Sequence, residues 1–268
     1  MKRSTRRRLV RGFSYALAAG LLAWLLLAGK ASLDRTYEWA WGSFFARGWP
    51  LLLRGLWFTL RLSLVSLLFA LPLGVAVGLC RTARDPGARL LGFLYVEAIR
   101  GTPLLVQLMV WYFVIGVALG DALGFEGGLD SFQAAACALS CFAASYIAEI
   151  VRAGIQSIDR GQMEAARSLG LTHAQAMRTV VLPQALRRVL PPLASEFIAL
   201  VKDSSLASVI GYEELAKRAQ DVQGTYFQTF EVWIAAAALY LVVSVILSLG
   251  VRLLERALGG GVASGAIR

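Results

Sequence analysis

Charged residues are scarce in this sequence: Asp, Glu, Lys and Arg make up 16% of the chain, whereas hydrophobic residues make up 57%. A typical soluble domain contains about 25% charged residues. The composition therefore excludes an ordinary soluble domain and indicates a protein embedded in a membrane. With 268 residues, the chain is long enough for a single bundle of about five or six membrane-spanning helices and little else.

Sequence motifs of an enzyme are also missing. No phosphate-binding loop of the form G-x-x-x-x-G-K-[ST] occurs, so we expect any nucleotide to be held by a partner. His173 is the single histidine and is interpreted as a surface residue, because no second histidine or cysteine lies near it in the sequence. The three cysteines, Cys80, Cys137 and Cys141, lie in apolar runs and are interpreted as packing residues. We expect no catalytic residue, no metal and no cofactor in this chain.

The net charge of +10 would favour nucleic-acid binding in a soluble protein. Here the arginines gather in particular loops between apolar runs, so the charge is interpreted as setting the orientation in a membrane, and no nucleic acid is expected. Residues 1–11 carry six basic residues and no acid, before an uncharged run over residues 12–29. This pattern predicts a cytoplasmic N-terminus; a cleaved signal peptide is the alternative.

The apolar runs predict six spans with both ends of the chain in the cytoplasm. The runs are residues 12–29, 55–80, 94–120, 131–150, 189–211 and 232–251. The proposed inner segments hold 18 Lys and Arg residues and the outer segments hold 6, as the positive-inside rule requires. We divide the chain into residues 1–53 (tail, extra span and a tryptophan-rich outer interfacial segment), residues 54–252 (transmembrane domain with a cytoplasmic loop over residues 152–188) and residues 253–268 (cytoplasmic tail).

A polar island inside the cytoplasmic loop, residues 159–183, predicts two short helices that meet at a corner. Asp159 is expected to cap the first helix, and Gly170 to end it in a left-handed conformation. Thr172 and Gln175 form a capping-box pattern for the second helix, which Pro183 is expected to end or kink. Each helix has one small apolar face and one charged face. This is the form expected of a piece that docks on another protein.

The spacing of residues in this island carries a family resemblance. The motif consists of Glu164, Ala165 and Ala166, Gly170 after three intervening residues, and then Val180, Leu182 and Pro183 after nine more. It resembles the EAA loop of membrane subunits of bacterial ABC importers. Three flanking segments, residues 99–105, 148–158 and 202–211, narrow the resemblance to permeases for polar amino acids of the histidine, glutamine, glutamate, arginine and opine type. The likeness covers roughly residues 57–252.

The resemblance implies an all-α integral membrane protein with the type I ABC importer transmembrane fold, built of five core spans plus one N-terminal span. It implies ATPase coupling through Gly161, Glu164, Ala165, Ala166, Gly170, Leu182 and Pro183. The implied partners are two ATPase subunits that bind ATP and Mg, a second permease that is identical or homologous, an extracytoplasmic amino-acid-binding protein, and membrane lipid. The implied location is the bacterial cytoplasmic (inner) membrane.

Ionisable residues inside a span indicate function, because a charge in hydrocarbon costs at least about 2.5 kcal/mol. Glu196, Lys202 and Asp203, with Ser204, Gln107 and Glu149, are the candidates for solute contact. The alternative is a structural network in which Lys202 and Asp203 pair with Arg100 or Glu149. For Glu149, an ion pair with Arg152 is favoured, and for Gln107, hydrogen bonding between helices. A secondary transporter or channel driven by an ion gradient is the alternative function. The transported amino acid stays open.

Overall fold

A computed structural model describes residues 37–123 and 128–257, together with residues 20, 24 and 34. Within these ranges all regular secondary structure is helical. The elements in chain order are α2 (Trp41–Ser43), η1 (Phe44–Gly48), α3 (Trp49–Thr82), α4 (Pro86–Arg100), α5 (Leu104–Val110), η2 (Trp111–Ile115), α6 (Gly116–Leu123), α7 (Ser131–Gln156), α8 (Arg160–Ser168), α9 (His173–Ala176), η3 (Met177–Val181), α10 (Leu182–Asp203), η4 (Ser204–Ile210), α11 (Leu215–Tyr226) and α12 (Thr229–Ala257). Apart from residues 20 and 24, the predicted first span, residues 12–29, lies outside the described residues.

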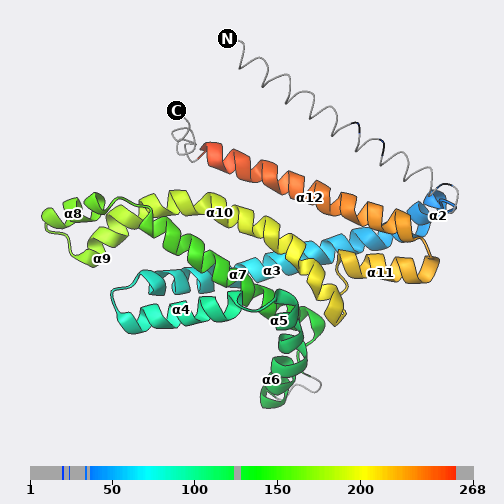
Figure 1. The fold of residues 1–268 in the computed structure, drawn as a ribbon, viewed down its shortest axis with the longest axis horizontal. Helices are drawn as coiled ribbons and strands as arrows, with labels where there is room; N and C mark the ends of the chain where they lie inside the picture. Colours follow the sequence, from blue (N-terminus) through cyan, green and yellow to red (C-terminus); the bar gives the residue numbers. More distant parts are fainter. Residues whose placement is uncertain (1–19, 21–23, 25–33, 35–36, 124–127, 258–268) are drawn as a thin grey trace, which may run out of the picture.

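The long helices α3 and α7 pack closely along the centre of the molecule (Figure 1). A Cβ atom added at Gly74 would lie 2.6 Å from the Ile147 side chain, and one added at Gly78 would lie 2.8 Å from the Val151 side chain. These distances are shorter than side-chain contacts allow, so both positions require glycine. Two glycines one turn apart thus bring the backbones of α3 and α7 into near contact.

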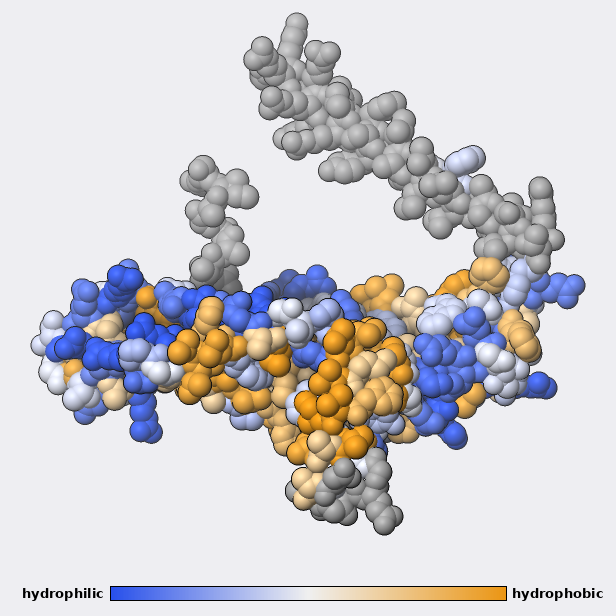
Figure 2. All heavy atoms as spheres, turned by 60° about the horizontal axis from the view of Figure 1, so that its bottom comes forward, coloured by the Kyte–Doolittle hydropathy of each residue, from blue (hydrophilic) through white to orange (hydrophobic). Residues whose placement is uncertain are grey.

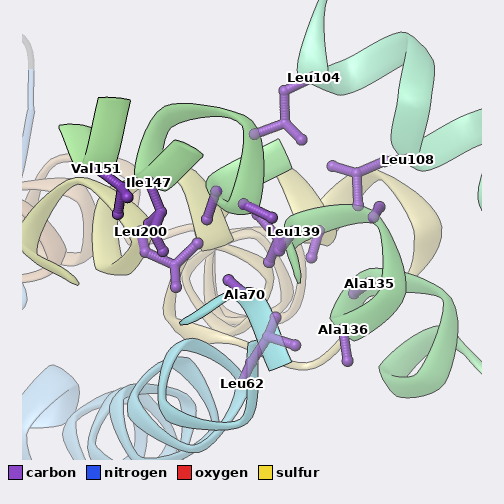
Figure 3. Close-up of a cluster of buried hydrophobic side chains, with 14 of the residues drawn as sticks. Leu62, Ala70, Leu104, Leu108, Ala135, Ala136, Leu139, Ile147, Val151 and Leu200 are labelled. Carbon is purple, nitrogen blue, oxygen red and sulfur yellow. The ribbon is translucent and has the colours of Figure 1, made fainter. Parts of the chain in front are cut away.

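Hydrophobic side chains from distant parts of the sequence form the main core around this helix pair. Figure 3 shows Leu62 and Ala70 of α3, Leu104 and Leu108 of α5, Leu139 and Ile147 of α7, and Leu200 of α10 gathered in one cluster. A second, separate cluster joins Phe44, Leu52, Leu215, Val222 and Val232 at the other end of α3. The two clusters share only α3 among the long helices.

The predicted span over residues 94–120 is not one straight helix. Instead α4 and the helix that starts at Leu104 meet at an angle of 99°. Pro103 lacks a backbone N–H and disfavours helical geometry at Thr102, which explains the break. Gln107 stabilises the bend: its Nε2 donates to the carbonyls of Ile99 (2.6 Å) and Thr102 (3.1 Å). The hydrogen bonding predicted for Gln107 therefore spans the bend between α4 and α5.

In the part of the chain that the structure describes, three helical segments are long and apolar enough to cross a membrane: Trp41–Thr82, Ser131–Gln156 and Thr229–Ala257. The bent pair of α4 and α5 adds a fourth if it counts as one span. The predicted span over residues 189–211 is not among them, because α10 carries several charged residues. Hydrophobic side chains gather over the middle of the face drawn in Figure 2, and hydrophilic side chains cover both ends, one of which is formed by α8 and α9. This distribution is that of a membrane protein with two polar ends.

Candidate functional site

The corner element, which we define as α8, α9 and η3, protrudes at one end of the molecule (Figure 1). Asp159 caps α8 as predicted, since its carboxylate accepts a hydrogen bond from the Gly161 amide at 2.6 Å. Gly170 has a φ of +84°, which confirms the predicted left-handed conformation. The two helices are therefore set at a corner by local signals that the sequence carries.

The second helix of the corner element begins at the predicted capping box. The Gln175 amide donates to Thr172 Oγ1 at 3.3 Å, and the Thr172 amide donates to Gln175 Oε1 at 2.9 Å. The expectation that Pro183 ends this helix is wrong, because residues 173–203 are helical without a break; a kink at Pro183 stays a prediction. After α9, residues Met177–Val181 wind as a π-helix and α10 begins at Leu182. Pro183 thus falls in the first turn of α10, where no amide donor is needed.

The predicted coupling residues divide into an exposed set and an inward-facing set. Gly161, Glu164, Ala165, Gly170 and Pro183 are exposed, Leu182 is half-buried, and Ala166 is buried with 4% of its surface accessible. Leu169, which the motif does not include, exposes 84% of its surface. The corner element therefore presents a charged carboxylate and a leucine side chain outward, while Ala166 packs within it.

Hydrogen bonds link the corner element to α10, and α10 to the end of α7. Arg188 of α10 donates from Nη1 to the carbonyl of Ser157 (2.5 Å) and to its Oγ (3.0 Å), at the C-terminal end of α7. Gln184 Nε2 donates to Gln162 Oε1 at 3.3 Å. A displacement of α8 is therefore expected to move α7 and α10 together.

The loop between α3 and α4 lies at the same end of the molecule as the corner element (Figure 1). His173 of α9 has a pKa below its ordinary value, first because of burial and then because of the positive charges of Arg84 and Arg167. Arg84 belongs to that loop, so its effect on the pKa of His173 agrees with the position of the loop beside α9 in Figure 1. The two arginine-rich loops that the sequence places on one side of the membrane therefore meet.

Gly154 marks the crossing of α7 and α10 beside the corner element. A Cβ atom at Gly154 would lie 2.1 Å from Val189 Cγ2. We expect Gly154→Ala to lower the free energy of unfolding by about 1–3 kcal/mol, the usual cost of overpacking, and to lower the thermal unfolding temperature in detergent. Val189→Ala in the same chain should restore it. Gly224→Ala, on α11 with open space around it, is the matched control, and an equal loss there would contradict this account.

Glu149 sits between two arginines near the end of α7. Its Oε2 accepts from Arg81 Nη1 at 2.7 Å, and its Oε1 accepts from Arg152 Nε at 3.0 Å. The predicted ion pair with Arg152 is confirmed. Sequence reasoning missed Arg81, because it lies 68 positions away, in the last turn of α3. Glu149 therefore joins the C-terminal ends of α3 and α7. Gln156 is a further acceptor for Arg152 in this network.

The charged residues of α10 do not form the predicted structural network. Within residues 37–123 and 128–257, no ion pair joins Lys202 or Asp203 to Arg100 or Glu149. The Arg100 guanidinium lies 4.8 Å from the centre of the Tyr146 ring instead. Lys202 is exposed and Asp203 half-buried. A lysine exposed in the middle of an apolar protein must face water or another subunit.

The end of α10 is also where the helix changes form. Asp203 is its last residue, a 3₁₀ segment follows from Ser204, and Gly211 ends that segment with a φ of +82°. Glu196 and Asp203 are seven residues apart and so share one face of α10, and both are half-buried. Ser204 is buried and donates to the Val201 carbonyl at 2.8 Å. Charged groups therefore gather at a discontinuity of the helix, as in the binding sites of many transporters.

Comparisons with known proteins agree with this arrangement. The family model described as "Binding-protein-dependent transport system inner membrane component" matches residues 70–260. The probable glutamine ABC transporter permease protein GlnM of Bacillus subtilis is 43% identical over 204 residues, which cover 76% of this chain and 91% of the relative. The glutamine transport system permease protein GlnP of Escherichia coli K12 is 39% identical over 207 residues, covering 77% of this chain and 92% of the relative.

Solved structures give the same result for the fold. A chain from the structure titled "Crystal structure of an amino acid ABC transporter with histidines" superimposes with a TM-score of 0.73 at 38% identity, covering 83% of this chain and 99% of the other. A chain of the inward-facing MetNI methionine ABC transporter superimposes with a TM-score of 0.66 at 26% identity, covering 78% of this chain and 96% of the other. The chain therefore has the type I ABC importer permease fold and belongs to the family of binding-protein-dependent transport system inner membrane components.

Proposed function

We propose that this permease subunit carries polar amino acids across the bacterial cytoplasmic membrane. Its partners are a second permease, identical or homologous, two ATPase subunits that bind ATP and Mg, and an extracytoplasmic binding protein that delivers the amino acid. The names of the glutamine permeases and of the amino acid transporter support the substrate class. The observation that carries the proposal is the corner element, a pair of capped helices that protrudes from a polar end and is bonded to α10, which is itself bonded to the end of α7.

The proposed topology has six spans with both chain ends in the cytoplasm. The positions of the corner element and of residues 81–89 at one end of the molecule support a common cytoplasmic side (Figure 1). α11 lies toward the other end and is placed on the outer side. Residues 1–53 supply the extra span and interfacial segment, residues 54–252 the transport domain with its coupling loop over residues 152–188, and residues 253–268 the tail.

In the proposed mechanism the exposed coupling residues fit into a groove on an ATPase subunit. Glu164 supplies a charged contact, Ala165 lets the backbones approach, and Gly170 holds the corner. When ATP binding brings the ATPase subunits together, the corner elements of the two permeases approach each other, and the long helices follow as rigid bodies. The pathway then opens outward to receive the solute.

Solute contact is assigned to the charged end of α10, with Glu196, Lys202, Asp203 and Ser204 as its residues. A zwitterion carries one charge of each sign, and Lys202 and Asp203 match both. Gln107 and Glu149 are weaker candidates, since the bend engages the Gln107 amide group and two arginines engage the Glu149 carboxylate.

We expect Lys202→Ala to raise the KM for transport about ten- to hundredfold, since one charge-assisted contact contributes about 1.5–3 kcal/mol. The maximal ATPase rate should stay unchanged. Lys217→Ala is the matched control, because Lys217 pairs with Asp221 on α11. Uptake of labelled glutamine, arginine and histidine by reconstituted vesicles measures the KM. If the KM were unchanged for every amino acid that is transported, Lys202 would not contact the solute.

Dependence on ATP tests the proposed function against an ion-gradient-driven secondary transporter. The chain would be co-purified with its ATPase and permease partners and reconstituted in vesicles with ATP inside or outside. Uptake that needs ATP on the side of the corner element and persists with ionophores supports the proposal. Uptake that ionophores abolish and that proceeds without ATP supports the alternative.

A further inference from the structure

The segment Tyr37–Gly48, hereafter the strap, precedes α3 and lies at the end of the molecule away from the corner element (Figure 1). It stands before residue 70, where the family model begins. Its hydrogen bonds to distant residues are made at the start of α12. Glu231, in the first turn of that helix, is fully buried with 0% of its surface accessible. A fully buried carboxylate needs donors, and here the strap supplies them.

Two groups of the strap donate hydrogen bonds to the Glu231 carboxylate. Tyr37 donates from its hydroxyl to Oε2 at 2.5 Å, and Ala40 donates from its backbone amide to Oε1 at 2.6 Å. Because both oxygens are engaged, the carboxylate fixes a side chain and a backbone position of the strap together. The start of α12 is also where a helix favours a negative charge.

Further contacts connect the strap with both helices of the neighbouring corner. Ser43 Oγ accepts a hydrogen bond from Gln228 Nε2 at 2.6 Å. The Tyr37 and Phe230 rings lie with centroids 4.7 Å apart. Phe44 is fully buried in the second hydrophobic cluster, which contains Val222 of α11 and Val232 of α12. The strap is therefore packed as part of the transport domain.

The corner between α11 and α12 has an unfavourable backbone. Phe227 has a φ of +57° and is the one residue other than glycine with a positive φ in the part of the chain that the structure describes. Its side chain is 81% exposed, so packing of the ring does not hold this conformation. Left-handed backbone at a bulky residue persists only where the surroundings enforce it. The strap bonds Gln228, which directly follows Phe227, and Glu231, four positions after it.

The opposite end of α11 is held by a different carboxylate. Glu214 is fully buried, caps α11 by accepting from the amides of Ala216 (2.9 Å) and Lys217 (2.7 Å), and accepts from the Tyr240 hydroxyl at 2.7 Å. The N-terminal end of α11 is thus fixed to α12 without the strap. Its C-terminal end is held at the Phe227 corner, where Trp233 Nε1 donates to Gln223 Oε1 at 2.6 Å and Val222 lies in the hydrophobic cluster with Phe44 of the strap. If the strap were released, α11 could pivot about Glu214.

We propose that Glu231 is a positioning residue that latches the strap onto α12 and so fixes the angle of α11 at the outer surface. This inference rests on the proposed function, which puts α11 on the side where the binding protein docks. When the loaded binding protein docks on a fixed α11, the displacement of α11 also moves α12 and the helices packed on it. When α11 is released from the strap, it moves alone and α12 stays in place.

The test uses the complete transporter in lipid vesicles with its ATPase, permease and binding-protein partners, the binding protein being loaded with glutamine, arginine or histidine. The variants are Glu231→Ala, Tyr37→Phe and the two combined. The matched controls are Glu38→Gln, an exposed carboxylate of the strap, and Glu255→Gln, an exposed carboxylate of α12. Hydrogen exchange of the strap and of the α11–α12 corner is measured beside basal and binding-protein-stimulated ATP hydrolysis.

We expect Glu231→Ala to raise amide exchange at Ala40 and around the α11–α12 corner by about tenfold or more. We expect it to reduce stimulated hydrolysis severalfold while basal hydrolysis stays unchanged. Tyr37→Phe should give a smaller effect of the same kind, and the combined variant should be no worse than Glu231→Ala, because both changes break one latch.

Two results would overturn the proposal. One is exchange in Glu231→Ala that equals exchange in the control variants, which would mean that no latch exists. The other is raised exchange with full stimulation, which would mean that the latch has no positioning role. If the unmodified transporter hydrolyses ATP but no binding protein stimulates it, the failure lies with the proposed function, and the exchange data still decide whether the latch exists.

Discussion

Replacing Gly170 with valine is expected to abolish ATP-driven transport while the membrane bundle stays folded. Gly170 has a φ of +84°, and an added Cβ would meet no atom within 4 Å. The penalty is therefore one of backbone conformation alone. A left-handed conformation costs an ordinary residue about 1–2 kcal/mol, and a β-branched residue is the least tolerant. We expect the corner element to open and the stimulated ATPase rate to fall about tenfold or more.

Gly170→Asn is the matched control for this change. Asparagine adopts the left-handed conformation more readily than other residues with a side chain, and the site has open space for it. It should keep most of the transport rate, whereas Gly170→Ala should fall between asparagine and valine. Transport and ATP hydrolysis by the reconstituted complex measure the order. Loss with asparagine equal to the loss with valine would show that the side chain, not the backbone, is at fault.

The corner element could be predicted from the sequence because its signals are local. Each signal depends on residues within a few positions of one another: the Asp159 cap, the capping box of Thr172 and Gln175, and the turn at Gly170. Such signals act before any tertiary contact forms. The same locality explains the error at Pro183, since the π-helical stretch before it resets the hydrogen-bond register and has no comparable sequence signal.

The bend at Pro103 and the buried carboxylates show what hydropathy leaves out. The length of an apolar run says whether it can cross a membrane, and residues 101–120 are long enough. It does not show a bend, yet the helices before and after the Thr102–Pro103 step meet at 99°. Pro103 indicates a helix boundary at this step, whereas the length of the apolar run predicts one continuous span. Glu214 and Glu231 stand in a segment predicted to be an outer loop, but both are fully buried. Their donors include Thr59 and Tyr37, which are distant in sequence, so no local pattern marks them.

The charged residues of α10 were recognised from sequence, whereas their surroundings were not. Their number alone showed that the helix must face protein or water. Which partners they have depends on how α4, α7 and α10 cross, and that crossing is set by small contacts such as Gly154 against Val189. Arg100 and Glu149 were plausible partners by charge, but each is engaged elsewhere, Arg100 with Tyr146 and Glu149 with two arginines.

The arginine pair around Glu149 leads to the second large expected effect. Glu149→Ala would leave the guanidiniums of Arg81 and Arg152 facing each other, with only 13% and 29% of their side chains accessible. Removing one partner of a fully buried ion pair costs about 3–5 kcal/mol. Glu149 is 27% accessible, so we expect a smaller loss of about 1–3 kcal/mol. We expect a lower unfolding temperature and ATP hydrolysis that no longer drives transport, as α7 loosens from α3.

Charge rescue separates this role from solute contact. Glu149→Gln keeps a hydrogen-bond acceptor for one arginine and should recover part of the stability, and Arg81→Gln combined with Glu149→Gln should recover more, since no repelling pair remains. Glu97→Ala, which removes an exposed carboxylate on α4, is the matched control and should change nothing. The ratio of amino acid transported to ATP hydrolysed is the deciding measurement, beside the KM. Because Glu149 joins two helices and does not contact solute, the ratio should fall while the KM stays unchanged. A raised KM with an unchanged ratio would instead indicate that Glu149 contacts the solute.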